Sequence, residues 1–186
     1  TLYQFGRKDA MPAIDNVAEG SFKIGKEVMS IQNGIQHPET FYTSDQNNWL
    51  KDGYLWINHW SMDNTRTTFH DDPVVKTIYD PSPAGFKMPA PNAFTEFSIN
   101  GQSTVNGGVP NVKGDWDNGY FFFNRISNPD AVVYMPVSGY RISGGGKLVD
   151  QGKSGMYWTA GPTKYSGFAE GWILPDGTYS GAMALS

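Results

Sequence analysis

The sequence predicts an α+β domain in which short antiparallel strands and two short helices are joined by long ordered loops. Runs of β-branched and aromatic residues recur at roughly 10–15-residue spacing, which is typical of a sheet of short strands. The 22 glycines and 12 prolines among 186 residues interrupt the chain too often for long helices. Aromatic residues make up 15% of the chain, and their large side chains allow short elements to bury a core.

The length of the chain predicts one domain over residues 1–186, because no internal repeat or linker divides it. The chain opens directly on the strand-like run LYQF, and no signal peptide precedes it. We therefore expect residues 1–186 to be one part of a longer exported protein.

Charge and composition exclude several classes of partner. The formal net charge is −4, and no basic cluster is larger than the pair Arg7-Lys8, so the basic stripe of a nucleic-acid-binding protein is missing. No apolar run approaches the ~20 residues of a membrane span, so we expect no direct membrane insertion. The chain has no cysteine, which excludes disulfides, thiolate nucleophiles and thiolate metal sites.

Seven short runs have the composition of strands and are bounded by Gly, Pro, Asn or Asp. They lie at residues 2–5, 120–123, 131–136, 139–142, 156–159, 171–174 and 181–185. Residues 117–119, Asp-Asn-Gly, are a strong turn signal before the second run. The Gly-rich run 144–146 ends the fourth strand, and it lacks the flanking pattern of a phosphate-binding loop.

Two short helices are expected. Ile24, Val28 and Ile31 lie at i, i+4 and i+7, on one face of a helix, and Gly34 stands where a glycine commonly ends one. The second covers residues 91–97, with a proline in the first turn, where its missing N–H does no harm.

The proline-rich stretch of residues 76–97 is expected to organise the rest of the chain. Its prolines exclude a helix interior or a central strand over most of its length. Apolar side chains are threaded between them, so we expect a rigid loop packed against the core, with Phe86 buried beneath it. Phe94 and Phe97 are expected to lie on one face of the helix that follows.

The same stretch carries a resemblance to a known family. KTIYDPSPAGFKMPAPNAF at residues 76–94 and GYRISGGGKLVDQGKSGMYWT at residues 139–159 together resemble the signature of a C-type-lectin-like domain. This domain occurs at the C-terminus of fimbrillin-like bacterial surface proteins, and YQFGRKD at residues 3–9 is similar to its opening. Two departures are visible: Ser82 stands where the family has a cysteine, and residues 183–186 end the chain before the closing basic motif.

The resemblance implies a C-type-lectin-like fold over most of the chain and an extracellular place at a bacterial cell surface. It also implies that residues 1–186 are the C-terminal part of the longer protein. The variable proteins of diversity-generating retroelements resemble this domain too, and they display diversified residues from the corresponding C-terminal segment. Calcium-dependent lectins of this fold class bind the ion through an acidic-Pro-Asn run and a Trp-Asn-Asp run, which are missing here.

No complete metal or cofactor motif is present. The three histidines have no ligand spacing, and residues 70–72, His-Asp-Asp, are typical of a solvated turn. Residues 115–119 begin like a calcium loop, but the twelfth position is Ile126 where a glutamate is required. We therefore expect no cofactor and no tightly bound metal.

The candidate binding site lies near the C-terminus, where exposed-candidate aromatic residues mix with Gly, Ser and Thr, as in an antibody paratope. The candidate residues are Thr163, Tyr165, Phe168, Glu170, Trp172, Asp176 and Tyr179. For Tyr165, Phe168, Glu170 and Trp172, a place in the core is an equally good interpretation. Tyr157 and Trp158 are interpreted as core, because they lie inside the motif of residues 139–159.

The sequence thus favours a non-catalytic ligand-binding or adhesion module of a bacterial cell-surface or pilus-tip protein. Its partner would be a host or bacterial surface protein or a glycan. One alternative is an assembly domain of a pilus-like fibre, in which residues 181–186 pair with a neighbouring subunit or a missing C-terminal strand. Another is a hydrolase with two carboxylates about 5–9.5 Å apart in one cleft.

Overall fold

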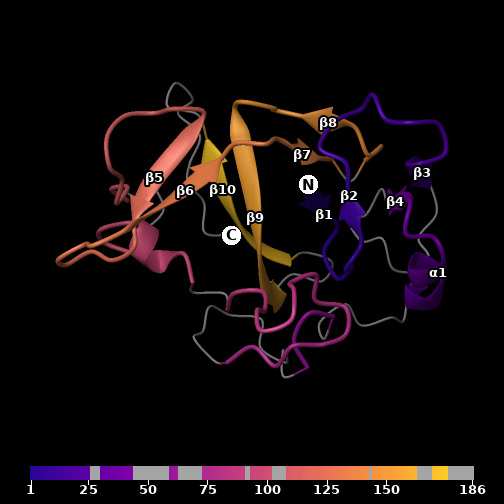
Figure 1. The fold of residues 1–186 in the computed structure, drawn as a ribbon, viewed down its shortest axis with the longest axis horizontal. Coiled ribbons are helices and arrows are strands. Elements are labelled where there is room, and N and C mark those ends of the chain that lie inside the picture. The colour runs from indigo at the N-terminus through magenta and orange to yellow at the C-terminus, as the bar shows by residue number, and fades with distance from the viewer. Residues whose placement is uncertain are drawn as a thin grey trace.

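The computed structural model describes residues 1–25, 30–43, 59–62, 73–90, 93–101, 108–142, 144–162 and 169–175. Side chains are described in these ranges except at residues 162 and 169–175, where only the backbone is. The described residues form a small strand-rich fold with very little helix (Figure 1). Its elements are β1 (Leu2–Tyr3), β2 (Ala10–Met11), β3 (Lys23–Gly25), α1 (Ile31–Gln36), β4 (Thr40–Tyr42), a 3-10 turn (Thr95–Phe97), β5 (Gly119–Phe123), β6 (Val132–Pro136), β7 (Tyr140–Arg141), β8 (Leu148–Val149), β9 (Ser154–Pro162) and β10 (Ala169–Pro175).

The β9–β10 hairpin is the longest pair of strands and runs through the middle of the molecule (Figure 1). The β5–β6 pair lies on one side of it, and β1, β2, β7 and β8 lie on the other. Among the described strands every pair is antiparallel except β3–β4, which is parallel. The sequence therefore predicted the antiparallel, short-stranded character of the fold correctly.

The strands predicted at 120–123, 131–136, 139–142, 156–159 and 171–174 correspond to β5, β6, β7, β9 and β10. The run at 2–5 forms β1, which pairs with β2. Strands β2, β3, β4 and β8 were not predicted, because strands of two or three residues carry no readable alternation of apolar and polar side chains. The strand predicted at 181–185 lies outside the described residues.

The first predicted helix was wrong in position. Ile24 lies in β3, which pairs with β4, and the helix begins only at Ile31. Ser30 caps this helix, because its Oγ accepts a hydrogen bond from the Asn33 N–H at 3.2 Å. Gly34 lies inside the helix and not after its end. The helical spacing of Ile24, Val28 and Ile31 was therefore misleading, because Ile24 belongs to a strand and Ile31 to a later helix.

The buried side chain of Arg7 binds the C-terminal end of α1. Its guanidinium donates to the carbonyls of Gly34 at 2.9 Å and His37 at 3.1 Å, at the C-terminal end of α1. A cation at this end compensates the carbonyls that have no partner within the helix. Burial lowers the pKa of Arg7, and the carboxylate of Asp9 at 3.2 Å opposes that change.

The second predicted helix is only the three-residue 3-10 turn. Phe94 and Phe97 do contact each other, as expected, with ring centroids 5.7 Å apart. The helix cannot continue because the chain turns into an isolated β-bridge between Ser98 and Pro110. The Phe97 carbonyl then accepts a hydrogen bond from the Asn111 N–H at 2.9 Å.

Two clusters of buried residues hold the fold together. The first, which we call the hairpin cluster, centres on Phe122 and Val137, with Phe94, Phe97, Val112, Trp116, Tyr120, Met135 and Tyr157 packed against it. The second, which we call the motif cluster, centres on Phe5, Trp60, Val74 and Ala160, with Tyr3, Tyr79, Met88, Ala90 and Trp158 packed against it. No helix within the described residues is long and apolar enough to span a membrane.

Candidate functional site

The predicted binding residues fall almost entirely outside the part of the chain that the structure describes. Thr163, Tyr165, Phe168, Asp176 and Tyr179 lie there, as do residues 181–186 of the assembly alternative.

Glu170 and Trp172 belong to β10, where the backbone alone is described. Trp172 stands opposite Tyr157 in the β9–β10 ladder, and Glu170 lies at a register shift between Ala169 and Gly171. The structure therefore describes the two strands of the hairpin that carries the candidate segment, but not residues 163–168 and 176–179 of the segment itself.

Strand β9 anchors this hairpin, because side chains on its two faces pack against two different clusters. Tyr157 contacts the hairpin cluster, whereas the next residue, Trp158, contacts the motif cluster. The Nε1–H of Trp158 donates to the Tyr3 carbonyl at 3.0 Å, and its ring centroid lies 5.8 Å from that of Phe5. Both residues thus pack against the core clusters as expected, although each is only partly buried.

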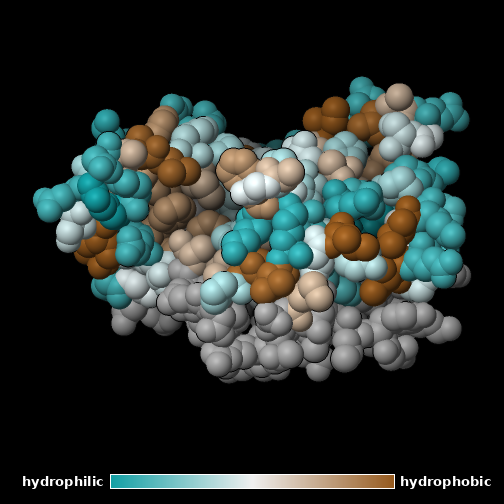
Figure 2. All heavy atoms as spheres, turned by 60° about the horizontal axis from the view of Figure 1, so that its bottom comes forward, coloured by the Kyte–Doolittle hydropathy of each residue, from teal (hydrophilic) through white to brown (hydrophobic). Residues whose placement is uncertain are grey.

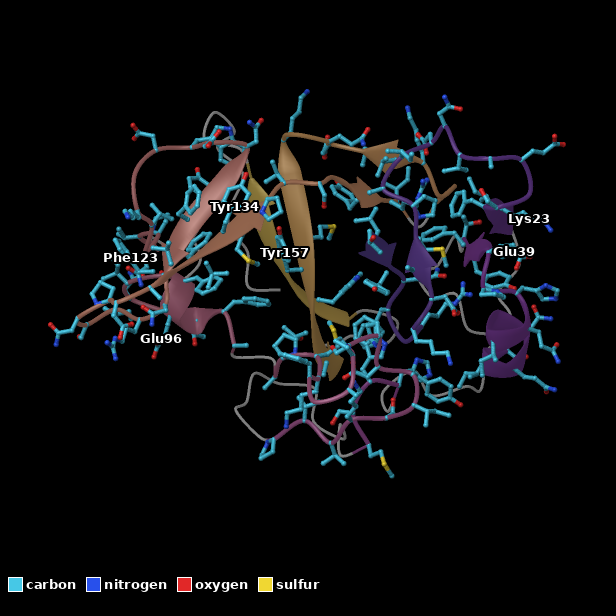
Figure 3. All side chains as sticks on the ribbon, in the orientation of Figure 1. Lys23, Glu39, Glu96, Phe123, Tyr134 and Tyr157 are labelled. Atoms are coloured by element: carbon cyan, nitrogen blue, oxygen red, sulfur yellow. The ribbon has the colours of Figure 1, made fainter. Side chains whose placement is uncertain are left out.

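The hydroxyl of Tyr157 donates to the Pro136 carbonyl in β6. Figure 3 labels Tyr157 together with Tyr134 of β6. Burial raises the pKa of Tyr157 to about 12, and the nearby Tyr134 adds to the rise. The phenol therefore stays protonated at physiological pH and serves as a hydrogen-bond donor, joining β9 to β6.

The far end of β9 contacts the proline-rich stretch. Thr159 and Ala160 are almost fully buried, and the Ala160 N–H donates to the Pro89 carbonyl at 2.8 Å. This bond lies three residues before Thr163. The proline-rich stretch is thereby fixed beside the point where the candidate segment leaves β9.

The loop of residues 76–88 is locked by two charged side chains. The buried carboxylate of Asp80 accepts hydrogen bonds from the Ser82 N–H at 2.7 Å and the Met88 N–H at 2.8 Å. The ammonium of Lys76 donates to the carbonyls of Pro83 at 3.0 Å and Phe86 at 2.7 Å, and also to that of Ser82. Lys76 and Asp80 lie 3.8 Å apart, so the cation and the anion together cross-link both ends of the loop.

The expected burial of Phe86 was wrong: 70% of this residue is exposed. Gly85, with φ of +85°, allows a tight turn in which the Phe86 N–H donates to the Pro83 carbonyl at 3.1 Å. The Phe86 carbonyl accepts from the Lys76 ammonium at the surface of the loop, and the Phe86 ring stays exposed. Tyr79, Met88 and Ala90 supply the stretch's contacts with the motif cluster instead.

Phe86 belongs to a group of exposed apolar residues that sequence reasoning missed. The group, which we call the loop surface, comprises Met62 (63% exposed), Val75 (39%), Ile78 (79%) and Phe86 (70%). An antiparallel bridge between Ser61 and Lys76 joins the two segments that carry it. Figure 2 brings this side of the molecule forward and shows hydrophobic atoms among hydrophilic ones. The sequence signal for it is the Pro-Ala-Gly run, which predicts a turn at residues 83–86.

Within the described ranges, no group of three or more His, Asp or Glu side chains could hold a metal ion. The predicted solvated turn at residues 70–72 lies outside those ranges. Residues 115–119 form the turn that was predicted, in which the Asp117 carbonyl accepts a hydrogen bond from the Tyr134 hydroxyl at 2.7 Å. Residues 144–146 connect β7 and β8 in a turn, with the Gly146 N–H bonded to the Ile142 carbonyl.

The described geometry thus provides rigid support for exposed apolar side chains, which is an arrangement suited to recognition by contact.

The described carboxylates of Asp9, Asp15, Glu39, Asp80 and Asp130 each lie in an ion pair. Comparisons of the chain with protein-family models, with curated proteins and with solved structures give no match.

Proposed function

We propose that this chain is a C-type-lectin-like, non-catalytic module that binds a ligand at a bacterial cell surface. In this proposal the contact surface is the segment of residues 163–179, with the loop surface beside it. The ligand is a host or bacterial surface protein or a glycan, and the module mediates adhesion.

The arrangement of the three sequence blocks that carry the resemblance supports the proposed fold. Tyr3 and Phe5 come from the first block, Tyr79 and Met88 from the second, and Trp158 from the third, and all five pack in the motif cluster. Because these signature residues pack together in one cluster, their role in the fold is sufficient to explain why the signature contains them. The recognition surface is then free to lie on other residues.

The observation that carries the proposed function is the locked loop of residues 76–88. A binding surface gains affinity when its contact residues are held in place beforehand, because less conformational freedom is lost on binding. Asp80 and Lys76 fix the loop by hydrogen bonds, while Phe86 and Ile78 remain mostly exposed. The bond between Ala160 and Pro89 joins the proline-rich stretch to β9, three residues before Thr163 in the sequence.

A screen of the full chain against glycan and protein arrays tests the proposal. For a ligand found there, Tyr165→Ala and Trp172→Ala should each weaken binding by about 2 kcal/mol or more, the size of a hot-spot residue. The matched control is Ile35→Ala, an exposed apolar residue on α1 whose loss should leave binding unchanged. Because Trp172 stands opposite Tyr157, its variant must also keep the thermal stability of the parent.

Two outcomes would contradict the proposal. Unchanged affinity in both variants would place the binding surface elsewhere. Cleavage of an array glycan, followed by mass spectrometry of the recovered oligosaccharides, would instead favour the carboxylate-based hydrolase.

A further inference from the structure

The turn that leads into β5 contains an asparagine followed by glycine, a pair with a chemistry of its own. Glycine has no Cβ, so its backbone nitrogen can approach the side-chain amide of the preceding asparagine without a steric clash. Attack of that nitrogen on the amide carbon converts the asparagine to an acid. The chain has four such asparagines: Asn33, Asn100, Asn106 and Asn118. Asn106 lies outside the described residues, and the fold holds the other three in different ways.

Asn33 is restrained at both of the groups that would react. It lies in α1, where the Gly34 N–H donates to the Ser30 carbonyl at 3.0 Å. Its Oδ1 accepts a hydrogen bond from the Tyr42 hydroxyl, also at 3.0 Å. The attacking nitrogen and the amide under attack are thus both held in place, so Asn33 provides an internal control.

Asn100 is restrained in a similar way by a single residue. The Gly101 N–H donates to the Ser98 carbonyl at 3.2 Å, and the Ser98 hydroxyl donates to the Asn100 Oδ1 at 2.9 Å. Asn100 is nevertheless exposed. Exposure alone therefore does not decide which of the pairs reacts.

Asn118 lacks both restraints. It is exposed, and its side-chain amide has no hydrogen-bond partner among the described residues. The Val137 N–H donates to the Asn118 carbonyl at 3.0 Å, and Gly119 stands opposite Pro136. Because the backbone groups of an antiparallel strand point to alternate sides, the Gly119 N–H points away from β6. No described residue accepts a hydrogen bond from it.

The movement that the reaction requires costs little at this position. The peptide plane between Asn118 and Gly119 has to turn until the Gly119 nitrogen faces the Asn118 Cγ. Among the described contacts, this rotation breaks only the bond from the Val137 N–H to the Asn118 carbonyl. Asn118 also has a φ of +50°, in the left-handed region that residues other than glycine seldom adopt. Release of that backbone strain offsets part of the cost of the broken bond.

We propose that Asn118 is a site of spontaneous deamidation in the folded chain, and that its isoaspartate product unpairs the start of β5. The Gly119 nitrogen gives its proton to base and bonds to the Asn118 Cγ, which closes a cyclic imide. The bond between Cγ and Nδ2 breaks, and Nδ2 leaves as ammonia with a proton from the medium. Water then opens the imide at either carbonyl and restores the Gly119 N–H. The product at position 118 is an aspartate or an isoaspartate, in which the backbone runs through the former side chain.

The two products should affect the turn differently. An aspartate keeps the same backbone, tolerates the left-handed φ as asparagine does, and adds one negative charge. An isoaspartate inserts an extra backbone carbon directly before Gly119, where space is short. Even a Cβ on Gly119 would lie 2.3 Å from the Met135 carbonyl oxygen. The insertion also displaces the carbonyl that accepts from the Val137 N–H, so the first pairing of β5 with β6 is lost. This site does not depend on the proposed ligand.

Incubation of the full chain in a mildly alkaline buffer, followed by peptide mapping with mass spectrometry, tests the proposal. Each asparagine is monitored in its own peptide by the mass change from an amide to an acid, and fragmentation distinguishes isoaspartate from aspartate. In the folded chain Asn118 should react about tenfold or more faster than Asn33, because at least one fewer hydrogen bond has to break. In guanidinium chloride the pairs should react at similar rates, because the fold no longer restrains them.

Two variants isolate the site and its products. Asn118→Gln should abolish modification at this position, because the longer side chain would have to close a larger and less favoured ring, and the other pairs should react as before. Freshly prepared Asn118→Asp carries the added charge without the extra backbone carbon. It should unfold at the temperature of the fresh wild-type chain, measured by circular dichroism. Wild-type chain enriched in isoaspartate by incubation should unfold at a lower temperature.

Three outcomes would overturn the proposal. A folded chain that stays unmodified at Asn118, while the denatured chain reacts there, would mean that the turn restrains this pair too. Equal rates at Asn33 and Asn118 in the folded chain would show that the observed hydrogen bonds do not control the reaction. An unchanged unfolding temperature after enrichment in isoaspartate would refute the loss of pairing at the start of β5.

Discussion

The two faces of β9 join two clusters that differ in how much of the chain they draw on. The hairpin cluster takes its residues from Phe94 to Tyr157, and most of them lie in or next to β5 and β6. The motif cluster takes its residues from Tyr3 to Ala160, in segments separated by long stretches of chain. A cluster that closes long loops determines the whole topology, whereas a largely local cluster stabilises one hairpin. This difference predicts that losses in the motif cluster are the more damaging.

The largest effect is expected from Trp158→Ala. The variant removes a large aromatic side chain from the motif cluster and leaves the Tyr3 carbonyl without its indole donor. We expect a loss of about 3–5 kcal/mol in the free energy of unfolding, measured by urea denaturation. The matched variant is Trp116→Ala, which removes a half-buried tryptophan from the hairpin cluster and should cost about 1–2 kcal/mol. Equal losses would mean that the two clusters contribute alike.

A smaller loss is expected from Asp80→Asn in the locked loop. Both carboxylate oxygens accept backbone N–H groups, and an asparagine would turn an N–H donor toward one of them. We expect a loss of about 2 kcal/mol, because one buried N–H is left unsatisfied. Asp130→Asn changes an exposed carboxylate paired with Arg125 and should alter stability by less than about 0.5 kcal/mol. Equal stability of Asp80→Asn and the wild-type chain would show that the loop is held by other contacts.

Sequence patterns predicted the hairpin side of the molecule better than the N-terminal side. Residues 120–123 and 131–136 are long enough for strand composition to be read, and they form β5 and β6. The N-terminal elements are two to six residues long and depend on contacts between distant residues. Arg7 shows this well: it appears in the sequence only as half of a basic pair, yet in the fold it is buried and binds Gly34 and His37.

The proline-rich stretch shows why part of the candidate site could not be predicted. Composition correctly indicated a rigid loop packed against the core through some of its apolar residues. It could not indicate which of them face inward, because that depends on the turn that Gly85 allows at residues 83–86. Alternation and helical periodicity assign faces only within regular elements, and this loop has neither. The prediction that Phe86 is buried failed for this reason.

The contribution of Tyr157 to the free energy of unfolding should depend on pH. Its pKa of about 12 in the folded chain exceeds the value of about 10 in an unfolded one. The folded state thus binds the phenolic proton more tightly, so stability is constant below about pH 10 and falls as the pH rises toward 12. Burial also raises the pKa of Tyr42, which contributes a fall of the same sign.

Tyr157→Phe tests this dependence. At neutral pH it should cost about 1 kcal/mol, because the hydrogen bond to the Pro136 carbonyl is lost. In urea denaturation between about pH 9 and pH 11, its stability should fall less steeply than that of the wild-type chain. Parallel curves for the two proteins would show that the hydroxyl is not buried against β6 in solution.

The smallest effect on stability is expected from Phe86→Ala. Because 70% of Phe86 is exposed, its removal should change the free energy of unfolding by less than about 0.5 kcal/mol. Met88→Ala removes a neighbouring side chain that packs in the motif cluster, and it should cost about 2 kcal/mol or more. If the loop surface takes part in recognition, Phe86→Ala should also weaken binding of an array ligand by about fivefold or more, the effect of ~1 kcal/mol. A loss of 3 kcal/mol or more in stability would instead mean that the ring is buried in solution, and recognition would then have to use residues 163–179 without the loop surface.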